Sequence, residues 1–348
     1  MTALYLLILS IITVLTSYII IYVNRYFGNK YIDNIKGVQK FHTKPTPRLG
    51  GLALYITFIF NTILTNEYQE LWIMIMLSSV PVFLSGFLED LFGNISPKYR
   101  LLAAFLSGLS FVLLTGFYVK NVNFLFFDNL LSIYFVSLIF TSLAISGVSN
   151  SINIIDGFHG LASGTLIIMF FTFAVIGWYI EDHLVVHLAI ISIFVFIGFF
   201  IINFPFGHIF LGDAGAYFGG FLLSIIAIIL PFRNPEISSW VSFLICLYPI
   251  IETLFSMIRK IIRKGHHPSK PDSVHLHMLI YRGLARKISK TFGLESYRNA
   301  ITSIIVLFFP LATCIMAITF YDVLSLIVAS IVIMISTYYL IYKKISLN

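Results

Sequence analysis

Charged residues are scarce in this sequence. Asp, Glu, Lys and Arg together make up 11% of the 348 residues, whereas they make up about 25% of an ordinary soluble domain. Hydrophobic residues make up 59%, and the mean hydropathy is +0.95. No polar stretch is long enough for a separate water-soluble domain of about 100 residues. The composition excludes a soluble globular protein and favours one integral membrane domain over residues 1–348.

Cysteine is also rare. Cys246 and Cys314 both lie in apolar stretches, which excludes a disulfide framework and a cysteine-based zinc site. No Lys or Arg precedes the first apolar stretch and no small-residue cleavage pattern accompanies it, so we expect a retained first span and not a signal peptide. Among partners we expect membrane lipids and no nucleic acid.

Long apolar runs dominate what remains. Windows of about 20 apolar residues, the length that crosses a bilayer, recur along the whole chain, and they predict an all-α polytopic membrane protein with about 11 transmembrane helices. The predicted spans are 3–23, 49–65, 71–88, 99–117, 130–147, 161–180, 184–203, 214–230, 238–258, 301–320 and 322–342.

The basic residues are distributed unequally between the connections. If the loops alternate between the two sides, all but two of the 22 Lys and Arg residues fall on one side, and the exceptions are Lys120 and Arg233. The positive-inside rule then predicts that the N-terminus is outside and the C-terminus is cytoplasmic. The longest connection, 259–300, is predicted to be a basic cytoplasmic loop.

Polar side chains gather in four segments on the predicted cytoplasmic side. The first, 40–51, combines Lys44 and Arg48 with two prolines and enters a span at a glycine pair, which suits anionic phosphates. The second ends the third span with adjacent carboxylates, Glu89 and Asp90. Neighbours on a helix point about 100° apart, so one acid should face a site and the other support it. The alternative for the first segment is a basic flank that only follows the positive-inside rule. The alternative for the second segment is an ordinary acidic helix end.

The third segment contains Asn150, Asn153 and Asp156, followed by His159. The i, i+3 spacing of Asn153 and Asp156 predicts that they share one helical face. Between residues 121 and 232 there is no Lys or Arg to pair with them. A hard divalent cation suits such oxygen ligands.

The fourth segment frames Asp213 between Gly212 and Gly215 at the start of a span. Asp is also a frequent N-cap residue, so a helix cap is the alternative to a ligand role. Because all four segments lie on one predicted side, we interpret them as parts of one phosphate-handling site.

Together these segments resemble the polyprenyl-phosphate N-acetylhexosamine-1-phosphate transferase family (glycosyltransferase family 4). This family includes the bacterial enzymes that start O-antigen, enterobacterial common antigen and wall teichoic acid synthesis. The resemblance covers nearly the whole chain. The motifs that carry it are 46–51, 89–90, 153–161, 210–213 and 271–277.

The resemblance implies a phosphotransferase that moves a sugar-1-phosphate, expected to be N-acetylhexosamine-1-phosphate, from a UDP-sugar to undecaprenyl phosphate. The products would be undecaprenyl-diphosphate-sugar, which begins a cell-surface polysaccharide such as lipopolysaccharide O-antigen, and UMP. The reaction would take place at the cytoplasmic face of the inner membrane. The implied cofactor is Mg²⁺, with Mn²⁺ as an alternative, and a homodimer is an open alternative to a monomer.

The resemblance also implies roles for individual acids and amides. Asp213 and Asn153 would hold the metal, and Asp156 would support the metal and nucleotide region. Asp90 would serve the attacking lipid phosphate. Since Glu89 stands where family members usually have Asp, we expect Asp90 to face the lipid phosphate and Glu89 to act from behind it.

Two histidines, His275 and His277, would belong to the catalytic residues and face phosphates. Further residues would bind the substrates. The substrate-binding set is Lys44, Arg48, Asn150 and His159.

Two positions besides Glu89 depart from the family pattern. His159 stands where the family has Asp or Asn, and Met278 stands where it has a second consecutive His. The sequence lacks the triple histidine of the muramyl-pentapeptide transferases, which argues against that branch. A transporter of an anionic or phosphorylated substrate is the main alternative, but transporters place polar groups near the midplane, and Glu252 is nearly the only charge inside a predicted span. A catalytically silent membrane partner is a third reading.

Overall fold

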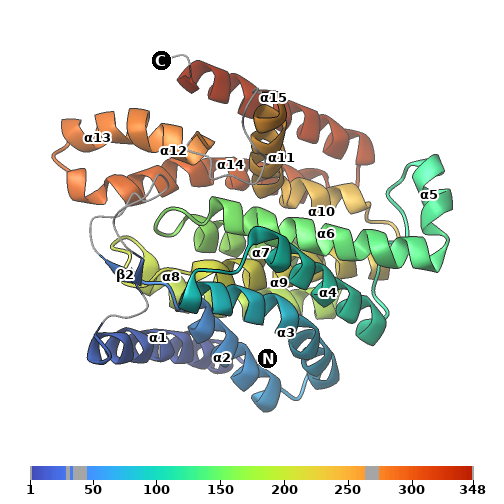
Figure 1. Ribbon diagram of the computed structural model, residues 1–348. Coiled ribbons are helices and arrows are strands. Elements are labelled where there is room, and N and C mark those ends of the chain that lie inside the picture. The colour runs from blue at the N-terminus through green and yellow to red at the C-terminus, as the bar shows by residue number, and fades with distance from the viewer. Residues whose placement is uncertain (1, 29–31, 34–44, 263–273, 347–348) are drawn as a thin grey trace.

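The computed structural model describes residues 2–28, 32–33, 45–262 and 274–346. Figure 1 shows an almost entirely helical bundle with one small strand pair. The elements are α1 (Ala3–Tyr26), β1 (Ile32–Asp33), β2 (Thr46–Pro47), α2 (Gly50–Leu64), α3 (Gln69–Phe92), α4 (Pro97–Thr115), α5 (Leu125–Leu131), α6 (Tyr134–Ile155), α7 (Leu161–Tyr179), α8 (His183–Asn203), α9 (Gly212–Arg233), α10 (Ser239–Ile245), α11 (Leu247–Ile262), α12 (Leu276–Ile280), a π-helix η1 (Tyr281–Ala285), α13 (Arg286–Thr291), a 3₁₀ turn η2 (Glu295–Tyr297), α14 (Arg298–Phe320) and α15 (Leu324–Ser346).

Nine helices in the described part of the chain are long and apolar enough to cross a membrane, and α10 with α11, which meet at a bend of 75°, make a tenth candidate. The predicted count of eleven is too high by this criterion, because α2 has 15 residues. At 1.5 Å per residue α2 is about 22 Å long, shorter than a hydrocarbon core of roughly 30 Å. Every predicted apolar segment nevertheless coincides with a helix, and the prediction of an all-α polytopic membrane protein is confirmed.

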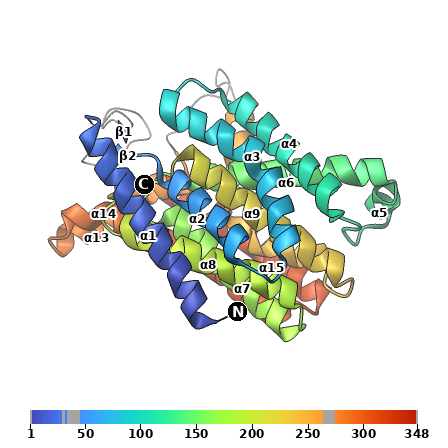
Figure 2. The ribbon, with the colours of Figure 1, turned by 90° about the horizontal axis from the view of Figure 1, so that it is seen from below.

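Helix α9 lies at the centre of the bundle and packs against α2, α3, α6 and α7. Small residues allow this close packing: a Cβ atom on Gly220 would lie 2.6 Å from Cα of Ser149 on α6, and one on Gly86 of α3 would lie 2.6 Å from Cα of Ala214. Membrane helices associate through such close van der Waals contact. On the other side of α2, α1 lies against α2 and α8 (Figure 2). The start of α9 is thereby held between several helix ends.

The outer surfaces of the peripheral helices α1, α4, α14 and α15 carry exposed large hydrophobic side chains. A contiguous apolar surface of this kind marks contact with a membrane. Examples are Leu7, Ile11, Ile19, Leu113, Phe308, Ile315, Val332 and Ile333.

One end of the bundle, at the right in Figure 1 where α5 lies, is fastened by Asp182 in the turn between α7 and α8. Its carboxylate accepts hydrogen bonds from Arg233 Nε and Asn234 Nδ2, each 2.8 Å long, and from the backbone N–H of Val185. Burial acts to raise the pKa of Asp182, but these donors outweigh it and hold the pKa below its usual value. The turn is thus tied to the end of α9.

The other end of the bundle is closed by a short backbone ladder. Strands β1 and β2 pair antiparallel, with Ile32 opposite Pro47. The carbonyl of Pro47 accepts from Phe210 N, and the N–H groups of Gly50 and Gly51 donate to the carbonyls of Phe210 and Leu211 at 2.9 and 2.8 Å. This ladder fixes the segment before α2 against the start of α9.

The predicted loop 259–300 contains regular structure in its described part. Helix α11 continues to Ile262, and α12, η1, α13 and η2 follow from Leu276 onward. Apolar residues recur here at helical spacing between charged residues. The helices are too short for a search with 20-residue apolar windows to find them. These short helices lie next to α14 at the end of the bundle that carries β2 (Figure 1).

Candidate active site

A cavity of about 360 Å³ lies at the β2 end of the bundle. The C-terminal ends of α3, α6 and α8 meet the N-terminal ends of α4, α9, α12 and α14 there. Its lining is mostly polar and comprises Arg48, Glu89, Arg100, Asn153, Ile154, Asp156, Gly157, Phe158, His159, Asn203, Phe210, Gly212, Asp213, His275, His277, Met278 and Asn299.

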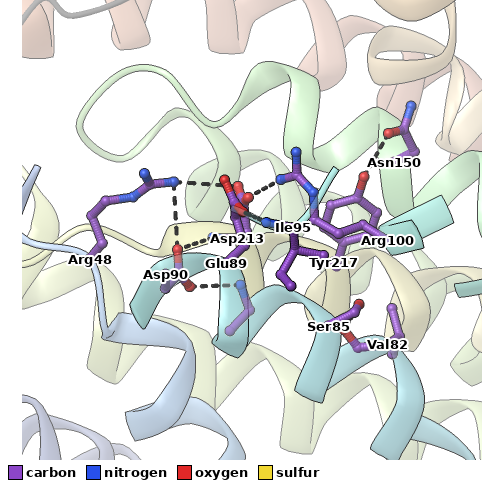
Figure 3. Close-up of polar contacts among 11 residues, drawn as sticks. Arg48, Val82, Ser85, Glu89, Asp90, Ile95, Arg100, Asn150, Asp213 and Tyr217 are labelled. Atoms are coloured by element: carbon purple, nitrogen blue, oxygen red, sulfur yellow. Dashed lines mark hydrogen bonds and ion pairs between the residues drawn. The ribbon is translucent and has the colours of Figure 1, made fainter. Parts of the chain in front are cut away.

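Asp213 lies between two arginines in this cavity (Figure 3). Nη2 of Arg48 is 3.5 Å from Oδ1 of Asp213, and Nη1 of Arg100 pairs with Oδ2. Arg48 also lies 3.5 Å from Oδ1 of Asp90. Two guanidinium groups therefore face the cavity together with carboxylates, and guanidinium groups are the side chains that best match phosphate geometry.

The acidic pair is oriented opposite to the prediction. Glu89 lines the cavity and accepts a 2.6 Å hydrogen bond from Ile95 N, whereas Asp90 is buried behind the wall. The carboxylate oxygens of Asp90 accept from the backbone N–H groups of Asp213 and Ala214, each at 2.9 Å (Figure 3). These are orphan donors of the first turn of α9, so Asp90 of α3 caps a helix distant in sequence.

The capping geometry excludes the alternative in which Asp213 caps its own helix. The N-cap position of α9 is Leu211, without a side-chain cap, and the carboxylate of Asp213 points to the arginines instead. Gly212 makes this approach possible: it has φ +72°, and a Cβ atom there would lie 2.1 Å from the carbonyl oxygen of Arg48. Only glycine tolerates both conditions.

A chain of contacts behind Arg100 leads to Asn150. The guanidinium carbon of Arg100 lies 5.8 Å from the ring centroid of Tyr217, and the Tyr217 hydroxyl donates a 2.8 Å hydrogen bond to Oδ1 of Asn150 (Figure 3). Asn150, predicted to bind substrate, is not in the cavity lining. Sequence reasoning missed Arg100 and Tyr217, because Arg100 looked like one of many positive-inside residues.

The turn between α6 and α7 carries Asn153, Asp156 and His159 to the cavity. The premise of a shared helical face is wrong, since α6 ends at Ile155 and Asp156 has φ −78° and ψ 63°. The turn is held by amides that the prediction did not assign: Asn203 Oδ1 accepts from Gly160 N at 2.6 Å, and Asn299 Oδ1 accepts from His159 N at 2.7 Å.

His159 and Phe210 place two aromatic rings beside this turn, with centroids 5.7 Å apart. His159 Nδ1 lies 3.0 Å from the carbonyl oxygen of Pro205, and because a carbonyl only accepts, Nδ1 carries the proton. The His159 ring is therefore fixed in orientation at the cavity wall.

The two predicted histidines lie together in the cavity lining. The rings of His275 and His277 stack with centroids 5.3 Å apart and planes 3° apart, and His277 meets the ring of Phe158 edge-on. Behind them is Glu252 of α11, whose Oε1 lies 2.9 Å from His275 Nδ1. The sequence signal for Glu252 was a lone charge inside an apolar span.

The structure thus brings most of the predicted residues into one cavity. Asp90 and Asn150 lie behind its wall, and Lys44 and residues 271–273 of the histidine motif are outside the described residues. The residues that line the cavity are Arg48, Glu89, Asn153, Asp156, His159, Asp213, His275 and His277.

Comparison with known proteins identifies the family. The profile of glycosyl transferase family 4 matches residues 72–231, from α3 to α9. A probable undecaprenyl-phosphate N-acetylglucosaminyl 1-phosphate transferase of Bacillus subtilis is 31% identical over 254 residues, which cover 72% of this chain and 70% of that protein. The chain belongs to glycosyl transferase family 4. The resemblance inferred from the motifs is confirmed, and the protein is an enzyme of this family of phospho-sugar transferases.

Two further relatives of this family 4 enzyme are named for different activities. An undecaprenyl-phosphate alpha-N-acetylglucosaminyl 1-phosphate transferase of Thermotoga maritima is 29% identical over 253 residues, 72% of each chain. A phospho-N-acetylmuramoyl-pentapeptide-transferase of Enterococcus hirae is 27% identical over 280 residues, 76% of this chain and 84% of that protein. The family 4 chain is thus similar to enzymes of both kinds.

The family 4 site fits Mg²⁺ in the type of its donors. Carboxylate and amide oxygens of Asp213, Asn153 and Asp156 line the same cavity, and Mg²⁺ prefers oxygen ligands. No three His, Cys, Asp or Glu side chains in the described ranges form a ready metal-binding group. Mg²⁺ commonly takes one or two protein carboxylates plus substrate phosphates, so the residues fit a site that the substrate completes.

Proposed function

We propose that this family 4 enzyme transfers N-acetylhexosamine-1-phosphate from a UDP-sugar to undecaprenyl phosphate. The observation that carries the proposal is the pairing of Arg48 and Arg100 with Asp213 in a polar cavity at one end of a membrane bundle. The activities in the names of the Bacillus and Thermotoga relatives support this acceptor lipid and this class of sugar.

In the proposed reaction, an oxygen of the lipid phosphate attacks the phosphorus atom that carries the sugar. A new P–O bond forms, and the bond from this phosphorus to the bridging oxygen breaks. The bridging oxygen leaves with the electron pair as part of UMP, and the lipid product is undecaprenyl-diphosphate-sugar. A phosphate monoester has a second pKa of about 6, so the attacking phosphate is already largely dianionic at neutral pH and needs no strong base.

Positioning and charge neutralisation then provide most of the catalysis, as in phosphoryl transfer generally. Arg48 and Arg100 neutralise phosphate oxygens, and Asp213, which pairs with both, orients the two guanidinium groups. Asp213 and Asn153 would hold Mg²⁺, which when bound supplies charge neutralisation to the diphosphate. Asp90 fixes the backbone of Asp213 through the cap of α9. His275 and His277 face phosphate from the same cavity lining.

The nucleotide end of the cavity is proposed to lie at the turn between α6 and α7. The rings of His159 and Phe210 offer flat surfaces for a uracil base, and Asp156 offers an acceptor for its N–H or for ribose hydroxyls. Asn203 and Asn299 keep this turn in place. The absence of a triple histidine from the motif that holds His275 and His277 supports an N-acetylhexosamine over a muramyl-pentapeptide substrate.

The hydrocarbon chain of the acceptor is proposed to lie in a second, apolar cavity. This cavity of about 510 Å³ lies toward the α5 end of the bundle and is lined by residues of α5, α6, α9, α10 and α11 and of the segment before α5, including Phe127, Phe140, Ala227, Trp240 and Phe243. An apolar lining without charges suits a polyprenyl chain. Replacing Ala227 with Phe should raise the KM for undecaprenyl phosphate more than the KM for a short-chain acceptor.

The polar cavity is proposed to face the cytoplasm. The connections on the side that carries the polar cavity hold most of the Lys and Arg residues, and by the positive-inside rule this supports a cytoplasmic orientation. Single cysteines near Asp213 and near Glu181, in a background without Cys246 and Cys314, should be labelled by an impermeant thiol reagent from inside and outside, respectively. Labelling near Asp213 from outside intact cells would contradict this placement.

A direct assay tests the proposed reaction. Purified protein in nanodiscs is supplied with undecaprenyl phosphate, Mg²⁺ and a panel of radiolabelled UDP-sugars, and lipid-linked sugar and UMP are measured. We expect equal amounts of both products with a UDP-N-acetylhexosamine, formed on the order of 100-fold more slowly or worse by the Asp213→Asn variant. Uptake of intact UDP-sugar into sealed vesicles without release of UMP would favour the transporter alternative.

A further inference from the structure

Glu252 is a carboxylate within the apolar part of α11, and its side chain is almost fully buried, with 1% of the residue exposed. Oε1 accepts hydrogen bonds from His275 Nδ1 at 2.9 Å and from Leu276 N at 3.0 Å. Oε2 accepts from the hydroxyl of Tyr338 on α15 at 2.9 Å. A buried charge is costly unless it is paired, and here every partner comes from the segment that carries His275 or from α15.

These contacts determine which ring nitrogen of His275 carries a proton. The Oε1 atom already accepts from the backbone N–H of Leu276, and a carboxylate oxygen in this arrangement is an acceptor. Nδ1 of His275 is therefore the donor, and Nε2 is the ring atom left for a group in the cavity that His275 lines.

The orientation of the His275 ring also affects His277, because the two rings stack. The two rings are nearly parallel, 3° apart, and Phe158 packs edge-on against His277 at 5.5 Å. A rotation of His275 would break this stack. One carboxylate on α11 thus holds both histidines of the cavity in place.

We propose that Glu252 is a positioning residue, and that its charge holds His275 with Nδ1 protonated and Nε2 directed at a phosphate oxygen of the substrate. The carboxylate stabilises an imidazolium that donates from Nδ1 to Glu252 and from Nε2 to phosphate during transfer. An amide in the same place would keep the two hydrogen bonds that Oε1 accepts but not the charge. This inference rests on the proposed function, since it assigns a phosphate to the cavity.

The variant Glu252→Gln separates charge from packing, because the amide oxygen can still accept from His275 and Leu276. We expect kcat to fall on the order of 10- to 100-fold, the range found when the hydrogen-bond partners of metal-ligating histidines are removed, and KM for the UDP-sugar to change by less than about threefold. Glu236→Gln, at an exposed position near the opposite end of α9, is the matched control and should retain wild-type rates. An unchanged kcat in Glu252→Gln would overturn the inference, and so would a loss that appears only in KM.

A spectroscopic measurement does not depend on turnover. In ¹⁵N-histidine-labelled wild-type protein, the resonance assigned to His275 by its loss in His275→Gln should show a protonated, strongly hydrogen-bonded Nδ1, and in Glu252→Gln it should move upfield. A His275 that is protonated only at Nε2 would overturn the inference even if Glu252→Gln does not fold. If the Nδ1 signal is present but wild-type protein releases no UMP with any UDP-sugar, the proposed function fails while the coupling of Glu252 to His275 is supported.

Discussion

Oδ1 of Asp90 accepts a 2.9 Å hydrogen bond from the backbone N–H of Asp213, across 123 residues of sequence. One carboxylate on α3 thereby holds the backbone that presents a second carboxylate to the cavity. The two acids have different roles, since Asp213 meets both arginines and Asp90 secures the turn from which it projects.

Replacing Asp90 with Asn should lower stability and activity together. The amide keeps one acceptor oxygen but loses the charge that faces the start of α9 and Arg48. Loss of a helix cap typically costs about 1 kcal/mol, and displacement of Asp213 should lower kcat on the order of tenfold or more. Tm and initial rates of UMP release in one detergent check this. A variant with wild-type Tm and a large loss of rate would show that Asp90 acts on the substrate instead.

Replacing Asp213 with Asn should abolish most turnover in a protein that remains folded. The change leaves Arg48 and Arg100 without their shared carboxylate and removes a proposed Mg²⁺ ligand. Removal of one group from a site built on positioned electrostatics costs on the order of 100-fold or more. Rates measured over a range of Mg²⁺ should show that the residual activity needs a higher concentration. Near-normal activity of Asp213→Asn at low Mg²⁺ would refute the ligand role.

Asn150→Ala and Tyr217→Phe should have similar and non-additive effects. Both remove the 2.8 Å hydrogen bond that fixes the ring beneath Arg100. Residues that act through one contact show coupling in a double-mutant cycle, so the double variant should lose no more activity than the worse single variant. Each single loss should be modest, about three- to tenfold. Multiplicative losses would mean that Asn150 contacts the substrate independently.

Asp182 should make stability depend on pH at the end of the bundle remote from the cavity. Its pKa is lowered on folding, since Arg233 and Asn234 outweigh the opposing effect of burial. Its stabilising contribution is therefore complete above the ordinary Asp pKa of about 3.9 and is lost as the pH falls through the lower folded value. The Asp182→Asn variant should have a lower Tm at pH 7 and a smaller fall in Tm between pH 5 and pH 3. Equal slopes in both proteins would contradict this, and rates of UMP release at pH 7 serve as the control.

The sequence alone was sufficient for the fold class and for most of the predicted residues that line the cavity. The length of an apolar window, about 20 residues, is set by bilayer thickness and needs no tertiary information. The long apolar helices could therefore be predicted from the sequence. Motif order likewise led to Asp213, His275 and the third polar segment, because oxygen and imidazole side chains are costly near hydrocarbon and therefore indicate function. The family followed from the same residues.

Tertiary structure decided what helical periodicity leaves open. Helix geometry predicts that the side chains of Glu89 and Asp90 point in different directions. Which of them lines the cavity depends on how α3 packs against α9. Arg100 was one basic residue among many until the start of α4 placed it beside Asp213. Glu252 was a lone buried charge until the chain returned through His275 and α15 to meet it. Hydrogen bonds between distant segments depend on three-dimensional packing. The local sequence around a residue does not identify a partner that lies far away in the chain.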